Sequence, residues 1–121
     1  MKTILLVDDE PLVVRFVSTI AKTLNYRIEA AKDGAEALWL YDLDPGIDAV
    51  VTDVRMPSMD GFELARQLRA KRVDLPILII SAYFEVDGKK PVDVDSSTGF
   101  HYLSKPFSGE QLAASLDLLF S

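Results

Sequence analysis

Hydrophobic residues along this chain form two kinds of pattern, short continuous runs and longer stretches with helical spacing. Three runs, at 4–7, 49–51 and 77–80, are continuous and rich in β-branched residues. Such runs are typical of strands covered on both faces. Segments 26–30 and 100–102 instead alternate apolar and polar residues, as half-exposed edge strands do. The sequence therefore predicts five strands, three in the middle of a sheet and two at its edges.

Helical patterns separate these strands. After Pro11, a residue that suits a first helical turn, apolar residues between 12 and 24 recur every three or four positions. Three further helix starts have capping-box spacing, in which a capping side chain precedes an acid or amide by three residues. These pairs are Asp33 with Glu36, Asp60 with Glu63, and Ser108 with Gln111. We expect the last helix to bury Leu112, Leu116, Leu119 and Phe120.

Alternation of strands and helices indicates repeated βα units and a parallel sheet. We place the first and third strands side by side in the centre and take the crossovers between parallel strands to be right-handed. We predict a doubly wound α/β fold with a five-stranded parallel sheet of order 2-1-3-4-5, a (βα)5 arrangement. Residues 1–121 should form one domain, because no linker or repeat divides them.

One stretch departs from this rhythm. Where a fourth helix is expected, residues 84–99 read FEVDGKKPVDVDSSTG. Gly88 and Pro91 are poor helix-interior residues, costing roughly 1 and 3 kcal/mol relative to alanine. The valines nearby form no apolar stripe that would offset this cost through burial. We predict a degenerate or short fourth helix followed by a mobile loop.

Composition narrows the class of protein. The 121 residues are 49% hydrophobic and 26% charged, the balance of a globular protein. A net charge of -6 without a basic patch argues against direct binding to nucleic acid or anionic membranes. The absence of cysteine excludes disulfides and thiolate metal sites. No apolar stretch is long enough for a signal peptide or a membrane span, so a cytoplasmic location is expected.

The informative polar residues follow the carboxyl ends of the predicted strands. Asp8 and Asp9 follow the first strand, Asp53 the third, Ser81 the fourth and Lys105 the fifth. Open α/β sheets bind ligands at this edge, where the strand order reverses. Three carboxylates gathered there repel one another unless a cation is present, and Mg²⁺ suits oxygen ligands. The alternative for Asp8 and Asp9, simple capping of the first helix, needs only one acidic side chain.

An aspartate in such a pocket can act as a nucleophile. Asp53 can form an aspartyl-phosphate when a phosphoryl group is held in line with it. Lys105 can meet a phosphoryl oxygen as a compact positive charge, and the Ser81 hydroxyl can donate a hydrogen bond to another. We therefore assign the phosphoryl-transfer chemistry to these three residues.

Five fragments carry a family resemblance: ILLVDDE at 4–10, TDVRMP at 52–57, DG at 60–61, SA at 81–82 and YLSKPF at 102–107. Together and in order, they resemble response-regulator receiver domains of two-component signalling, which share the flavodoxin-like fold, along the whole chain. The resemblance implies that a sensor histidine kinase or a histidine phosphotransfer protein phosphorylates Asp53. It also implies Mg²⁺ ligation by Asp9, Asp53 and the backbone carbonyl of Arg55, with Asp8 bound directly or through water.

The same resemblance gives roles to further residues. Ser81 and Tyr102 match the hydroxyl and aromatic switch positions, although packing on an edge strand explains Tyr102 equally well. Lys105 matches the phosphate-contacting lysine, and its bond to the following proline is expected to be cis. Arg55 and Tyr83 match the variable positions that flank the phosphoryl group, so their bulk should slow hydrolysis of the aspartyl-phosphate.

What the resemblance implies is a signalling domain rather than a metabolic enzyme. Such a domain catalyses only its own phosphoryl transfer and dephosphorylation. Its output passes to a downstream protein target that the sequence does not identify, with phosphorylation-dependent dimerisation as one form of output. The sequence leaves open whether the chain is complete or part of a longer protein.

Two other functions share parts of this pattern but fit the residues less well. Phosphatases that resemble haloacid dehalogenases carry a second aspartate two residues after the nucleophile, where this chain has Arg55. A flavodoxin-like mononucleotide carrier needs a phosphate-cradling loop after the first strand, and the charges of Asp8 and Asp9 oppose one. Turnover of simple phosphate esters or bound flavin would favour these alternatives.

Overall fold

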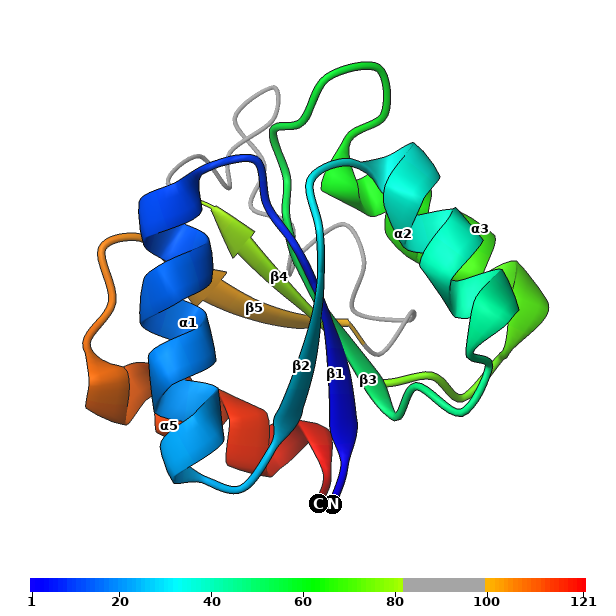
Figure 1. The fold of residues 1–121 in the computed structure, drawn as a ribbon. Coiled ribbons are helices and arrows are strands. Elements are labelled where there is room, and N and C mark those ends of the chain that lie inside the picture. Colours follow the sequence, from blue (N-terminus) through cyan, green and yellow to red (C-terminus); the bar gives the residue numbers. More distant parts are fainter. Residues whose placement is uncertain (82–99) are drawn as a thin grey trace.

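The computed structural model describes residues 1–81 and 100–121. These residues form one parallel sheet of order β2-β1-β3-β4-β5, which confirms the predicted topology (Figure 1). The strands are β1 (Thr3–Val7), β2 (Arg27–Ala31), β3 (Ala49–Asp53), β4 (Ile77–Ser81) and β5 (His101–Ser104). The helices of the described residues are α1 (Pro11–Thr23), α2 (Gly34–Leu43), α3 (Gly61–Lys71) and α5 (Gly109–Leu119). The segment for which we predicted a degenerate fourth helix lies outside the described residues.

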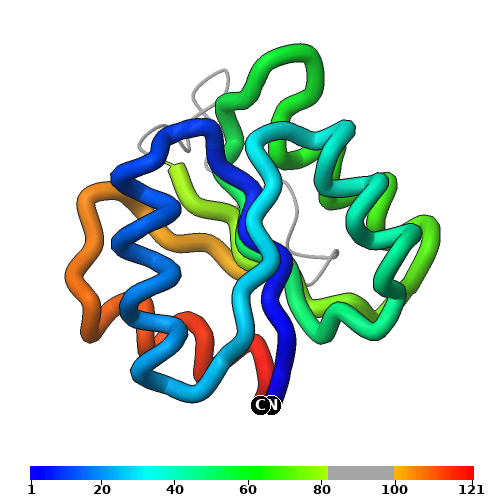
Figure 2. The backbone as a smooth tube through the Cα atoms, viewed as in Figure 1, coloured from blue at the N-terminus to red at the C-terminus, as the bar shows by residue number. Residues whose placement is uncertain are grey.

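Helices cover both faces of the sheet (Figures 1 and 2). On one face α2 and α3 pack over a core that includes Leu5, Val50 and Ile79. On the other face α1 and α5 pack over a second core that includes Ile4 and Leu78. The two chain ends lie close together (Figure 2). They lie at the opposite end of the strands from the acidic residues.

Burial along the strands follows the predicted pattern. All residues of β3 and β4 are buried, as are four of the five residues of β1. The edge strands β2 and β5 are partly exposed instead. Continuous apolar runs thus mark strands with a helix layer on each face, and alternation marks the edges.

The helix starts follow from local hydrogen bonds. The Asp33 carboxylate accepts a hydrogen bond from the Glu36 amide at 2.8 Å, and Asp60 and Ser108 cap α3 and α5 in the same way. Of these three helix starts, only that at Ser108 has the complete capping box, in which the Gln111 side chain also accepts from the Ser108 amide, at 2.8 Å. In the parts of the chain that the structure describes, no helix has the length and apolar character of a membrane span.

Candidate functional site

The candidate site lies where four strands end at the same edge of the sheet. Asp53 and Ser81 are the last residues of β3 and β4, while Asp8 and Lys105 directly follow β1 and β5. Since β1 pairs with β3, and β4 lies between β3 and β5, the ends of these strands converge. The structure thus brings Asp8, Asp53, Ser81 and Lys105 to one place, as the positions of the predicted strands implied.

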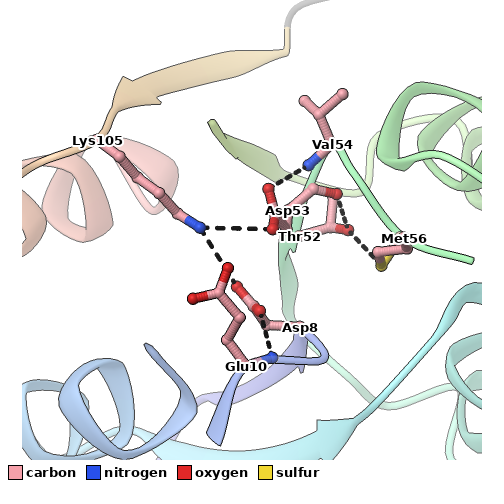
Figure 3. A network of polar contacts seen from close by, with 7 residues as sticks. All are labelled: Asp8, Glu10, Thr52, Asp53, Val54, Met56 and Lys105. Atoms are coloured by element: carbon pink, nitrogen blue, oxygen red, sulfur yellow. Dashed lines mark hydrogen bonds and ion pairs between the residues drawn. The ribbon is translucent and has the colours of Figure 1, made fainter. Parts of the chain in front are cut away.

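Three charged side chains meet in the centre of this edge (Figure 3). The Lys105 Nζ lies 3.4 Å from the Asp53 Oδ2 and 3.9 Å from the Asp8 Oδ2. Only 2% of the Asp8 side chain and 7% of the Asp53 side chain are exposed. The Lys105 ammonium is therefore shared by two carboxylates that are almost completely buried. Its single positive charge does not balance the two negative charges of Asp8 and Asp53.

Glu10 is a third acidic residue of this cluster, and the sequence prediction missed it. Asp8, Glu10 and Asp53 each present a carboxylate oxygen, and these oxygens all lie within 4.8 Å of one another. The signal was present in the sequence, because Glu10 ends the Asp-Asp-Glu run that supplied the predicted ligands. Asp9 does not belong to this group of three; it is exposed and lines a shallow hollow between the start of α1 and the end of β2.

The backbone around Asp53 is held by several contacts. The Val54 amide donates to the Asp53 Oδ1 at 2.7 Å, and the buried Thr52 hydroxyl donates to the Asp53 carbonyl at 2.9 Å (Figure 3). The Gly61 amide donates to the Val54 carbonyl at 2.8 Å, which brings the start of α3 against the end of β3. A methyl group on Gly61 would collide with the Asp53 carbonyl oxygen. Close packing of α3 thus fixes the position of Asp53 and leaves its Oδ2 facing Lys105.

Burial perturbs the protonation of this cluster. Burial raises the pKa of Asp8 from 3.8 to about 6. The negative charges of Asp53 and Glu10 contribute to this rise, whereas the hydrogen bond from the Glu10 amide and the Lys105 ammonium limit it. A cation that binds Asp8 would lower the pKa again, so this edge of the sheet favours a positively charged ligand.

The other predicted residues lie around this centre. Ser81 is buried, and its carbonyl accepts a hydrogen bond from the Lys105 amide at 3.0 Å. Arg55 is exposed in the segment after β3. Tyr102 is half-buried in β5, and its ring lies 6.5 Å from that of Phe62 in α3. The Lys105–Pro106 peptide is cis, as expected. Tyr83 lies outside the described residues.

An apolar groove opens beside Lys105. It has a volume of about 520 Å³ and lies between α1 and the segment that joins β5 to α5. Its lining consists of Leu12, Val13, Phe16, Lys105, Pro106 and Phe107. Leu12 is 80% exposed, and the rings of Phe16 and Phe107 lie 5.8 Å apart. Exposed leucine and phenylalanine side chains thus adjoin the acidic site.

The fold and site define a doubly wound α/β domain with an acidic, lysine-containing site at its topological switch point. Residues 4–117 match the family model described as the response regulator receiver domain. The chain belongs to this family, and it is a receiver domain of two-component signalling.

Curated relatives agree with this assignment. The response regulator MprA of Mycolicibacterium vanbaalenii is 41% identical over 116 residues, which cover 96% of this chain and 49% of that protein. The response regulator MprA of Mycobacterium leprae is 40% identical over 116 residues, covering 96% of this chain and 50% of that protein. The chain therefore spans about half the length of these relatives.

Solved structures show the same fold. The chemotaxis protein CheY4 of Vibrio cholerae is 30% identical with a TM-score of 0.86, and the match covers 98% of each chain. The response regulator TrrA of Thermotoga maritima, solved in complex with Mg²⁺-BeF, is 31% identical with a TM-score of 0.85. That match covers 98% of this chain and 99% of TrrA.

Proposed function

We propose that Asp53 is the phosphoacceptor of this receiver domain, with Lys105 and Ser81 as the residues that assist transfer. The observation that carries this proposal is the Asp53 carboxylate itself, buried at the switch point with the Lys105 Nζ 3.4 Å from its Oδ2. A buried aspartate beside a lysine is well placed to attack phosphorus, because the ammonium can neutralise charge on the incoming phosphoryl oxygens.

In the proposed transfer, an Asp53 carboxylate oxygen forms a bond to phosphorus as the phosphorus–nitrogen bond of a phosphohistidine breaks. The leaving imidazole nitrogen keeps the electron pair of that bond and takes a proton from water. The Val54 amide holds the Asp53 Oδ1 at 2.7 Å, which fixes the orientation of the carboxylate. Positioning and charge neutralisation account for most of the catalysis in reactions of this kind.

Mg²⁺ is the proposed cofactor, and the residues present fit it. Asp8 and Asp53 are nearly buried and together outweigh the single charge of Lys105, so the site attracts a hard cation such as Mg²⁺. Asp8, Asp9, Asp53 and the Arg55 backbone carbonyl are the proposed ligands, all of them oxygen donors. When bound, Mg²⁺ would withdraw negative charge from the phosphoryl oxygens.

The proposed phosphodonor is a histidine kinase or a histidine phosphotransfer protein. The apolar groove beside Lys105 supports a protein donor, because Leu12 and Phe16 offer apolar contact area next to the acceptor. Ser81 and Tyr102 remain the proposed switch pair. A downstream protein target, phosphorylation-dependent dimerisation and a cytoplasmic location also belong to this proposal, which extends to residues 1–121 as one receiver domain.

Intact-mass measurement after incubation with Mg²⁺ and acetyl phosphate tests the acceptor. Wild type should gain one phosphoryl group, and Asp53→Asn should gain none because its amide is not nucleophilic. Asp117→Asn is the matched control, since Asp117 is an exposed residue on α5. It should be modified like wild type. An equal adduct on wild type and Asp53→Asn would place the acceptor elsewhere.

A further inference from the structure

Glu10 is a charged residue beside the proposed site, and it has no role in the function proposed above. Its carboxylate oxygen lies within 4.8 Å of carboxylate oxygens of both Asp8 and Asp53, and its side chain extends toward them (Figure 3). Asp8 and Asp53 are almost completely buried, whereas Glu10 is exposed. Glu10 therefore stands between the buried acids and solvent.

Capping of α1 does not account for this orientation. Glu10 is the N-cap residue of α1, yet its side chain makes no capping hydrogen bond. Its backbone amide, in contrast, donates to the Asp8 Oδ1 at 2.9 Å, which holds Glu10 next to the site. Pro11 follows as the first residue of α1 and limits the backbone further. The start of the helix thus holds the Glu10 backbone while its carboxylate stays available to a ligand.

The charges of the cluster also need a partner. Three carboxylates and the Lys105 ammonium leave two negative charges within a few ångströms of one another. A monovalent cation would cancel one of these charges, whereas a divalent cation cancels both. Glu10 thus adds negative charge beside the two buried acids, and this charge strengthens the attraction of a divalent cation to the site.

We propose that Glu10 is a positioning residue of the cation site, which attracts a divalent cation by its charge and holds one of that cation's water molecules. This inference rests on the proposed function only in placing the cation at Asp8 and Asp53. Mg²⁺ keeps several waters when proteins bind it, so an exposed carboxylate at the rim can accept hydrogen bonds from them. Glu10 is thus a positioning residue rather than a catalytic one.

Calorimetric titration of the purified chain with Mg²⁺ alone tests this role. Glu10→Gln keeps the length of the side chain and removes its charge, so the dissociation constant for Mg²⁺ should rise roughly three- to tenfold. Glu10→Asp keeps the charge and should stay within about twofold of wild type. Glu110→Gln removes the same charge from an exposed position in the first turn of α5 and should bind Mg²⁺ as wild type does.

Ionic strength separates a charge effect from a structural one. Screening shortens the reach of an exposed charge, so the difference between Glu10→Gln and wild type should shrink as salt rises from about 0.01 M to 0.15 M. A difference that persists unchanged would indicate a distorted site and overturn the proposal. Equal Mg²⁺ affinities of Glu10→Gln and wild type at low salt would also overturn it. Because no phosphodonor is present, a failure of Asp53 to accept a phosphoryl group is a separate result.

Discussion

The middle of the central strands and their carboxyl ends differ in the kind of side chain that they bury. Before the last two positions of β1, β3 and β4 the buried side chains are apolar, whereas the buried polar residues of the described chain are Asp8, Thr52, Asp53 and Ser81. All four lie in the last two positions of a strand or directly after it. Burial of apolar groups stabilises the fold, and burial of carboxylates costs free energy that only a ligand or partner recovers. Stability and function thus occupy different segments of the same strands.

Truncation of a strand body should have the largest effect on stability. Ile79 is fully buried in the middle of β4. Ile79→Ala should lower the free energy of unfolding by about 4 kcal/mol, because it removes apolar contacts and leaves a cavity. Ile79→Val should cost only about 1 kcal/mol. Urea unfolding followed by circular dichroism measures both, and similar costs for the two variants would contradict a closely packed interior.

An added methyl group at the strand end should have a smaller effect on stability and a direct effect on the site. In Gly61→Ala the methyl group would meet backbone atoms of Asp53 and Val54, which cannot rotate away. We expect a loss of about 2 kcal/mol in unfolding free energy, and weaker phosphorylation because Asp53 is displaced.

Gly109→Ala is the matched control for this variant. Gly109 is also the first residue of its helix, but its methyl group would meet the Ile20 Cδ1 at 3.0 Å, the movable tip of a side chain. Its stability and phosphorylation should stay close to wild type. If both variants behave alike in urea unfolding and in intact-mass measurement, the close approach of α3 does not position Asp53.

Neutralising a buried acid should change stability the least, and it should raise stability where the two substitutions above lower it. Burial raises the pKa of Asp8 from 3.8 to about 6, so the folded state favours the protonated form. The stability that this preference contributes is complete at low pH and is lost as pH rises through about 6. In cation-free buffer at pH 7, Asp8→Asn should therefore be more stable than wild type, by about 1 to 2 kcal/mol after allowance for solvent screening.

Thermal unfolding between pH 4 and pH 8 checks this sign. The advantage of Asp8→Asn should be near zero at the acid end and should grow as Asp8 of the wild type ionises. Saturating Mg²⁺ should reduce or reverse it, because the wild type then gains a ligand for its carboxylate. An advantage that is constant over the whole pH range would show that ionisation of Asp8 is not its cause.

The sequence by itself determined the features that depend on neighbouring residues or on the length of a pattern. Capping at Asp33, Asp60 and Ser108 is a contact over three residues, so its spacing is visible in the chain. Continuous apolar runs predicted the central strands, and right-handed crossovers together with the flavodoxin-like arrangement of βα units gave the correct order. Once that order is fixed, residues at the strand ends meet at one edge.

The tertiary structure alone decided which side chains at that edge lie in contact. Asp8, Asp9 and Glu10 are consecutive in the sequence, yet only Asp8 and Glu10 have carboxylate oxygens in the group that lies within 4.8 Å of Asp53. Asp9 lies outside that group. The direction of each side chain depends on the end of β1, the start of α1 and the path of β3, which come from different parts of the chain. Burial likewise sets the pKa of Asp8, and close packing of α3 requires glycine at position 61. Long-range packing creates these properties, so no short segment of sequence encodes them.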